Sequence, residues 1–161
     1  MAETTITNIK DAFKLFEDNL KIAVATLAQQ DQIGLERLST LDNYTLKHPR
    51  GVYGLIYNGD VYQRDELVKS NTVKMKEDLM IGVVSIIRFF DNPNASVSDY
   101  PMMPGEYPEL AVDTLSGLEI FNNRPEYERR VIPVRTELVD ETNGIWKYLT
   151  TFLIPRDFIK S

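Results

Sequence analysis

The side chains that most often carry catalysis are sparse in this sequence. His48 is the only histidine and there is no cysteine, so thiol chemistry and cysteine-based metal sites are excluded. A single histidine needs a partner within reach to act as an acid–base catalyst or as a metal ligand. Because His48 lies between Lys47 and Pro49, just before a predicted strand, we interpret it as a solvent-facing loop residue.

Carboxylates are the one kind of metal ligand that gathers in a single part of the chain. No Lys or Arg lies between Arg88 and Arg124, whereas the acids of this stretch are Asp91, Asp99, Glu106, Glu109, Asp113 and Glu119. Oxygen ligands of this kind can hold calcium or magnesium, but the stretch lacks the glycine and the closing glutamate of an EF-hand loop. We therefore predict no metal site and no bound cofactor, and we interpret the acids as a solvated or partner-facing surface.

Neither a serine nucleophile nor a phosphate-binding loop is indicated. Ser116-Gly117 lies inside a helical pattern and lacks the Gly-x-Ser-x-Gly elbow. The glycines at 51, 54 and 59 do not have the spacing of a phosphate loop and are better explained by turn geometry. We predict that the protein is not an enzyme, and a small metal-dependent hydrolase that uses the clustered acids is the alternative.

Length and composition are those of one folded domain, which we expect to cover residues 1–161. Apolar residues make up 43% of the chain and charged residues 26%, the balance of a globular protein. The net charge of −6 argues against tight binding of duplex DNA, which normally needs a basic surface. No run approaches the roughly 20 apolar residues of a membrane span, and the first residues have no signal-peptide pattern.

The N-terminal third predicts a long helix followed by an ambiguous region. Apolar residues recur at spacings of three and four, which defines one helix face: Ile6, Ile9, Phe13, Phe16, Leu20, Ala23 and Leu27. Thr7 or Asn8 can cap the start of this helix. With no flanking charge pattern for a coiled coil, we expect the face to pack into the core. Residues 29–47 fit either a short helix or an irregular strand.

The middle of the chain alternates between strand and loop signals. Residues 52–57 and 61–63 are rich in β-formers and flank Asn58-Gly59, which predicts a hairpin. Residues 79–90 are apolar on both faces, as in a central strand. The prolines within residues 91–108 predict a long loop, and the apolar pattern of residues 110–121 then predicts a second helix that ends near Asn122.

The last part of the chain predicts a second hairpin. Residues 130–139 and 145–154 flank a turn at residues 140–144, and the second of these strands is apolar on both faces, which favours an internal position. Pro133 cannot donate to a ladder, so its strand is an edge or carries a bulge. The order α-β-β-β-α-β-β predicts an α+β fold with a mainly antiparallel sheet and helices on one face.

Two segments resemble a known family. The sequence HPRGVYGLIYNG at residues 48–59 resembles the Pro-x-Gly, apolar strand, Tyr-x-Gly signature of the small tail-terminator and tail-completion proteins of Mu-like contractile-tailed phages. Residues 135–139 and the Gly144-Ile145-Trp146-Lys147-Tyr148 segment resemble the closing hairpin of that family. The resemblance covers residues 5–155 in element order, and its sharp matches lie at these two segments.

The resemblance implies a structural subunit of a phage tail or of a tail-like contractile particle. In this family such a subunit forms a ring, typically a hexamer, which caps the tail tube and meets the head connector. The implied partners are further copies of the chain, tube and sheath proteins and connector proteins, and the implied location is the virion tail, assembled in the host cytoplasm. DNA would pass through such a ring without being gripped, which suits an acidic chain. A monomeric adaptor domain is a further alternative.

A closed ring needs two different surfaces of one chain that complement each other. The acid-only stretch and the arginines that follow it are such a pair, because a guanidinium group can hold a carboxylate with two hydrogen bonds. Methionines in a proline-held loop also suit a protein contact or pack back onto the core. The candidate partner-binding residues are Asp99, Met102, Met103, Glu106, Arg124, Arg129 and Arg130.

Overall fold

The computed structural model describes residues 6, 8–27, 30–40, 44–64, 73–89, 102–120 and 129–160. In chain order the elements are α1 (Ile9–Ala25), a 3-10 turn η1 (Gln30–Gln32), β1 (Ile33–Arg37), β2 (Gly51–Arg64), β3 (Val73–Arg88), α2 (Glu106–Leu115), β4 (Ile132–Thr142) and β5 (Ile145–Lys160). This order confirms the α-β-β-β-α-β-β arrangement predicted from the sequence.

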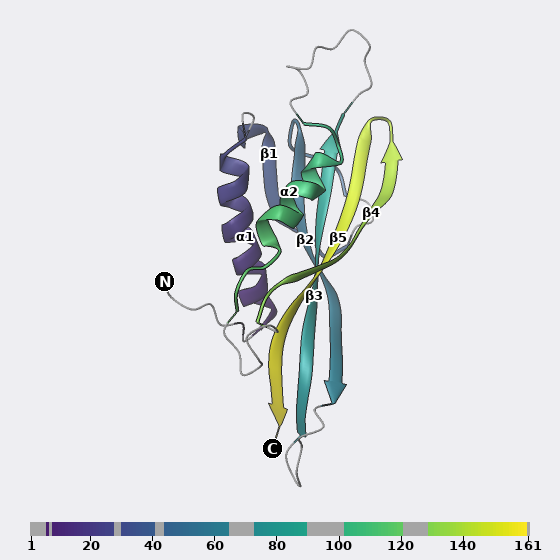
Figure 1. Ribbon diagram of the computed structural model, residues 1–161. Helices are drawn as coiled ribbons and strands as arrows, with labels where there is room; N and C mark the ends of the chain where they lie inside the picture. The colour runs from purple at the N-terminus through teal and green to yellow at the C-terminus, as the bar shows by residue number, and fades with distance from the viewer. Residues whose placement is uncertain are drawn as a thin grey trace.

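Within the described residues, five strands form one sheet in the order β1-β2-β3-β5-β4. Neighbouring strands are antiparallel except β1 and β2, which are parallel. Both helices lie on the same face of the sheet (Figure 1). The mainly antiparallel sheet, the central β3, the internal β5 and the edge position of Pro133 are therefore confirmed.

Helix α1 begins and packs as its sequence predicts. The side chain of Asn8 accepts a hydrogen bond from the backbone N–H of Asp11 at 3.0 Å, which caps the first turn. Ala12, Phe16 and Leu20 are buried, so the apolar face packs into the main core together with residues of α2 and the sheet, as predicted. The Phe16 ring lies edge-on to Phe152 of β5, with ring centroids 5.4 Å apart.

The other face of the sheet is covered by the chain segment that joins β1 to β2. Val52, Ile56, Val84 and Ile86 form a second buried cluster on this face. Leu38, Tyr44 and Leu46 from the joining segment pack against it. The ambiguous region is thus a short edge strand followed by a segment that crosses the sheet, because apolar side chains on two-sided strands require cover on both faces.

The predicted hairpin at Asn58-Gly59 is wrong. Strand β2 runs unbroken from Gly51 to Arg64, and its register with β3 shifts between Tyr57, opposite Ile81, and Asp60, opposite Leu79. Two residues therefore face one, which is a β-bulge, and Gly59 takes the positive φ of 105° that the bulge needs. The Asn-Gly signal marked a backbone conformation that a turn and a bulge share.

Several further boundaries differ from the predictions. Strand β3 covers Val73–Arg88 and not residues 79–90, β4 ends at Thr142 and not at 139, and β5 ends at Lys160 and not at 154. Helix α2 begins at Glu106, inside the segment predicted as loop, and it ends at Leu115 and not near Asn122. Its early end follows from an extended backbone at Ser116 and a positive φ at Gly117. Strand β4 begins at Ile132 and not at residue 130. The remainder of the predicted loop, residues 91–101, lies outside the described part of the chain.

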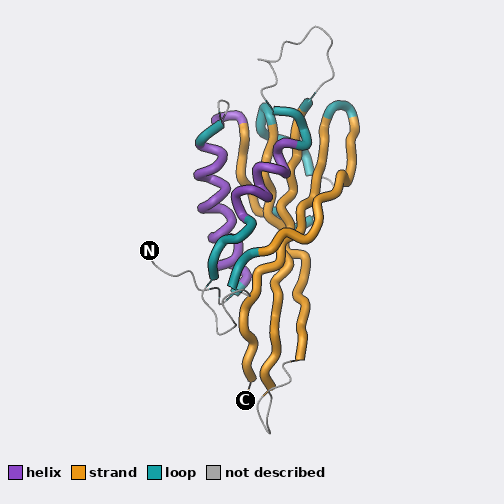
Figure 2. Tube along the Cα trace, in the orientation of Figure 1, coloured by secondary structure: helices purple, strands orange, loops and turns teal. Residues whose placement is uncertain are grey.

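Strands β2, β3 and β5 continue beyond the helical layer as a three-stranded arm (Figures 1 and 2). Strand β1 pairs with β2 only up to Leu55, and β4 pairs with β5 only over residues 145–153. The three central strands therefore continue without these neighbours as the arm, which consists of residues 57–64, 73–80 and 153–160. The molecule is therefore elongated, with a covered five-stranded part and a thinner projecting part.

Candidate functional site

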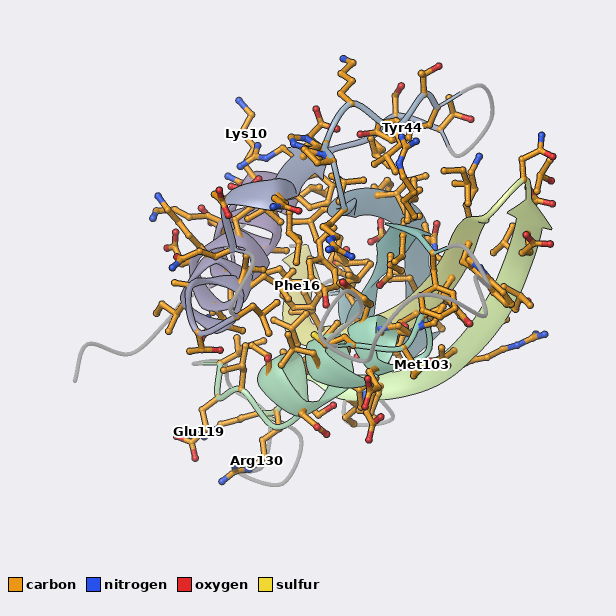
Figure 3. The ribbon with its side chains drawn as sticks, turned by 90° about the horizontal axis from the view of Figure 1, so that it is seen from above. Lys10, Phe16, Tyr44, Met103, Glu119 and Arg130 are labelled. Atoms are coloured by element: carbon orange, nitrogen blue, oxygen red, sulfur yellow. The ribbon has the colours of Figure 1, made fainter. Side chains whose placement is uncertain are left out.

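The described residues place one of the two candidate methionines at the surface. Met103 has 57% of its surface exposed, whereas Met102 is half-buried and packs against the main core (Figure 3). The Glu106 carboxylate accepts a hydrogen bond from the backbone N–H of Met103 at 2.6 Å. Glu106 is thus engaged in holding the turn before α2, and Met103 alone remains available for a contact.

Arginine and acid do meet, but within the chain. The Arg130 guanidinium lies 2.7 Å from the Glu119 carboxylate and donates a second hydrogen bond to the carbonyl of Gly117 at 3.1 Å (Figure 3). An isolated bridge between the backbones of the same two residues aligns them. Arg129 is half-buried, and Asp99 and Arg124 lie outside the described residues. Within the chain, Arg130 thus pairs with Glu119, and its role between copies stays a prediction.

His48 is not a freely solvent-facing residue, contrary to the prediction. About 31% of its side chain is exposed, and its Nε2 atom is buried 3.8 Å from the carboxylate of Glu36. The ring lies on Gly34, where a Cβ atom would come within 2.1 Å of it, so glycine at this position makes room for the imidazole. The Tyr44 hydroxyl also donates to Glu36, and burial together with this bond raises the pKa of Tyr44.

A groove of about 570 Å³ lies on the outer face of the sheet, between the joining segment and the β4–β5 hairpin. Its lining contains one carboxylate, from Asp140, and no histidine, serine or cysteine. The lining residues are Tyr44, Thr45, Leu46, Ile86, Arg88, Asp140, Thr142, Asn143, Ile145 and Lys147. The groove therefore offers polar and apolar contacts, among them the Thr142 hydroxyl, which donates to the Asp140 carboxylate at 3.1 Å.

The described residues contain no group of three or more His, Cys, Asp or Glu side chains that could hold a metal ion. Glu109 and Asp113 share the exposed side of α2, as their spacing predicts, but no third ligand of the described chain joins them. No helix in the described ranges is long and apolar enough to cross a membrane.

The surface feature that sequence patterns did not single out is strand β4. Four of its large apolar side chains are about half exposed: Ile132, Val134, Leu138 and Val139. Val134 and Val139 are the extra residues of two bulges, where the register with β5 shifts. The available signal was the pair of adjacent apolar residues at 138–139 on a strand already predicted to be an edge.

A second, smaller exposed group lies on the arm. Tyr57 and Tyr62 both donate to the same oxygen of Asp60, at 2.5 and 3.3 Å. Val61, between Asp60 and Tyr62 in the strand, points to the opposite face of the sheet and has 39% of its surface exposed. The hydrogen bond to Asp60, with some help from burial and from nearby negative charge, raises the pKa of Tyr57 to about 12. The Tyr57 hydroxyl is thereby held protonated.

A scan against models of protein families finds no match for this chain. A search of curated protein sequences likewise finds no relative. The resemblance noted in the sequence thus depends on residues 48–59, 135–139 and 144–148 and on the order of the elements.

Proposed function

We propose that this protein is a structural subunit of a phage tail or of a tail-like contractile particle, in which copies of the chain form a ring that ends the tail tube and joins it to the head connector. It acts by assembly and not by catalysis. The resemblance at residues 48–59, 135–139 and 144–148 suggests the kind of particle, and the exposed surface of β4 supports assembly on physical grounds.

The observation that carries the proposal is the exposure of β4. A soluble protein ordinarily blunts its edge strands and covers large apolar side chains, because exposed ones promote association. Here four such side chains, each about half exposed, lie along eleven residues of one edge strand, Ile132–Thr142. A surface of this kind fits a permanent neighbour.

Two alternatives make different predictions. A metal-dependent hydrolase requires a cluster of carboxylates, and the described residues contain no such cluster. A monomeric adaptor requires that the chain stays at 18.5 kDa, its own mass, at all concentrations. The adaptor and the ring can therefore be told apart by the mass of the protein in solution.

The test is to measure the mass of the purified protein and to image it. Sedimentation equilibrium is expected to give a multiple of 18.5 kDa, and negative-stain electron microscopy is expected to reveal closed rings. When added to sheathless tail tubes, the protein should bind at tube ends and not along their sides. A monomer with no binding to tubes would overturn the proposal.

A further inference from the structure

We propose that one copy of this chain docks the outward face of its α1 on the β4 edge of the next copy, so that the two flanks of the molecule form a head-to-tail contact. This inference rests on the proposed ring and names the surfaces that would build it. It differs from the acid-and-arginine pairing expected from the sequence, and it does not use Arg130, which pairs with Glu119 in the chain.

The outward face of α1 is a basic stripe around one exposed apolar residue. The exposed positions of the helix fall on one line along its axis: Lys10, Lys14, Asp18, Lys21, Ile22 and Ala25. Ile22 has 69% of its surface exposed, the largest value among the large apolar side chains described. Three lysines against one aspartate, which pairs with Lys14 at 2.8 Å, leave an excess of positive charge.

The β4 edge has the opposite character. Around its four exposed apolar side chains lie Arg135 and three acids, Glu137, Asp140 and Glu141. Arg135 pairs with Glu137 at 3.0 Å. Lys147 of β5 stands opposite Asp140, so Glu141 supplies the excess of negative charge near Leu138 and Val139. The two flanks thus match in both respects, apolar against apolar and lysine against carboxylate.

The position of the two flanks suits a head-to-tail contact. β1 and β4 are the two edge strands of the sheet, and α1 contacts β1. In the view from above, α1 with Lys10 and the strand β4 lie on opposite sides of the molecule (Figure 3). A heterologous contact joins two different surfaces of the same chain, and repetition of such a contact closes into a ring when the rotation permits.

The backbone of β4 favours a helix over a strand as its neighbour. Pro133 has no N–H to donate, and the bulges at Val134 and Val139 interrupt the regular ladder. A strand of another copy could therefore not extend the sheet along β4 without losing hydrogen bonds. The exposed side chains of β4 remain available for packing. Helix α1 of the next copy could pack against them without needing hydrogen bonds from the β4 backbone.

The experiment uses three single variants of the full chain, each purified alone. Ile22→Glu changes the α1 flank, Leu138→Glu changes the β4 flank, and Val61→Glu is the matched control on the arm, outside both flanks. Each replaced side chain is at least 39% exposed in the free chain, so we expect all three variants to fold, which far-UV circular dichroism and melting curves check. Mass is then measured by sedimentation equilibrium.

The pairing predicts a specific pattern of masses. Each flank variant alone should weaken association by roughly tenfold or more and run at 18.5 kDa, and Val61→Glu should assemble like the parent. An equal mixture of the two flank variants should form a dimer and stop there, because the intact β4 of one meets the intact α1 of the other. The dissociation constant of the parent should rise with salt, since lysine–carboxylate attraction is screened.

Several results would overturn the inference. Assembly of both flank variants like the parent, or loss of assembly in Val61→Glu alone, would place the contact elsewhere. Loss in only one flank variant would indicate a symmetric contact between like surfaces. A dissociation constant that stays constant or falls with salt would mean that the lysines of α1 and the carboxylates of β4 do not attract each other across the contact. A parent that is itself monomeric is a different outcome, because it would overturn the proposed ring.

Discussion

The two edges of the sheet are treated in opposite ways. At the β1 edge, the Arg37 guanidinium pairs with Glu17 of α1 and lies over the Phe13 ring, 5.3 Å from its centroid. Ile33 is buried, and most other side chains of this strand are partly covered. At the β4 edge, every side chain except that of Glu137 is exposed. One edge is closed by the chain itself, and the other is open.

The two edges differ in how far other parts of the same chain cover them. Helix α1 and the segment after β1 cover one edge and both faces near it, although β1 is only five residues long. The longer β4 receives no such cover from the described residues, while it carries large apolar side chains. Pro133 and two bulges protect its backbone from strand addition, so its side chains and not its ladder are left for a partner.

The largest expected effect tests the covered side. Phe16 is fully buried between α1 and β5, so Phe16→Ala should lower the free energy of unfolding by about 3–5 kcal/mol through the lost burial and the cavity left behind. Urea unfolding followed by tryptophan fluorescence measures this. Ile22→Ala on the exposed side of the same helix is the control, and at concentrations where the chain is a monomer it should change stability by less than about 0.5 kcal/mol. A cost below about 1 kcal/mol for Phe16→Ala would mean that α1 is not part of the core.

A smaller effect is expected where β2 packs closely against β3. A Cβ atom at Gly51 would come within 2.6 Å of the Ile86 carbonyl oxygen, which is backbone and cannot turn aside. Gly51→Ala should therefore cost about 1–3 kcal/mol of stability. At Gly105, by contrast, a Cβ would meet nothing within 4 Å, and the same change there should stay within about 1 kcal/mol. Equal effects at the two glycines would contradict the close packing of these strands.

Sequence patterns were sufficient where contacts are local. The helix cap, predicted at Thr7 or Asn8 and found at Asn8, and the spacing of Phe16 and Leu20 depend on neighbours a few residues away. The turn between β4 and β5 was predicted at residues 140–144 and is narrower, at Asn143-Gly144. The parallel pairing of β1 and the bulge at Gly59 depend on strands distant in sequence, so local signals misread the latter and left the former ambiguous. The Glu119–Arg130 pair is likewise set by the path of the chain after α2.

A hydrogen bond across the covered face has an expected effect of about 1 kcal/mol. The buried Tyr53 hydroxyl donates to the carbonyl of Tyr107 at 2.7 Å, and Tyr53→Phe removes this bond. Burial also raises the pKa of Tyr53, so the folded chain keeps its proton after the unfolded chain has lost it. The free energy of unfolding should thus fall as pH rises above about 10, the usual tyrosine value. This slope should be shallower in Tyr53→Phe, and identical pH profiles for variant and parent would contradict the role of this tyrosine.

The smallest expected effect lies beside the open edge. Arg130 and Glu119 are both exposed, and such pairs contribute about 0–1 kcal/mol. Arg130→Ala should therefore change thermal stability little, and because its partner is within the same chain it should leave the assembled mass unchanged. If Arg130→Ala dissociated the assembly, Arg130 would have to lie at the interface between copies.

The central claim is that this chain associates with itself through its open edge. Sedimentation equilibrium of the parent over a wide range of concentrations, with Leu138→Glu beside it, tests that claim most directly. The account predicts a parent mass several times 18.5 kDa that dissociates on dilution, and a variant that stays at 18.5 kDa throughout. A parent that remains at 18.5 kDa at every concentration, or a variant that assembles like the parent, would contradict it.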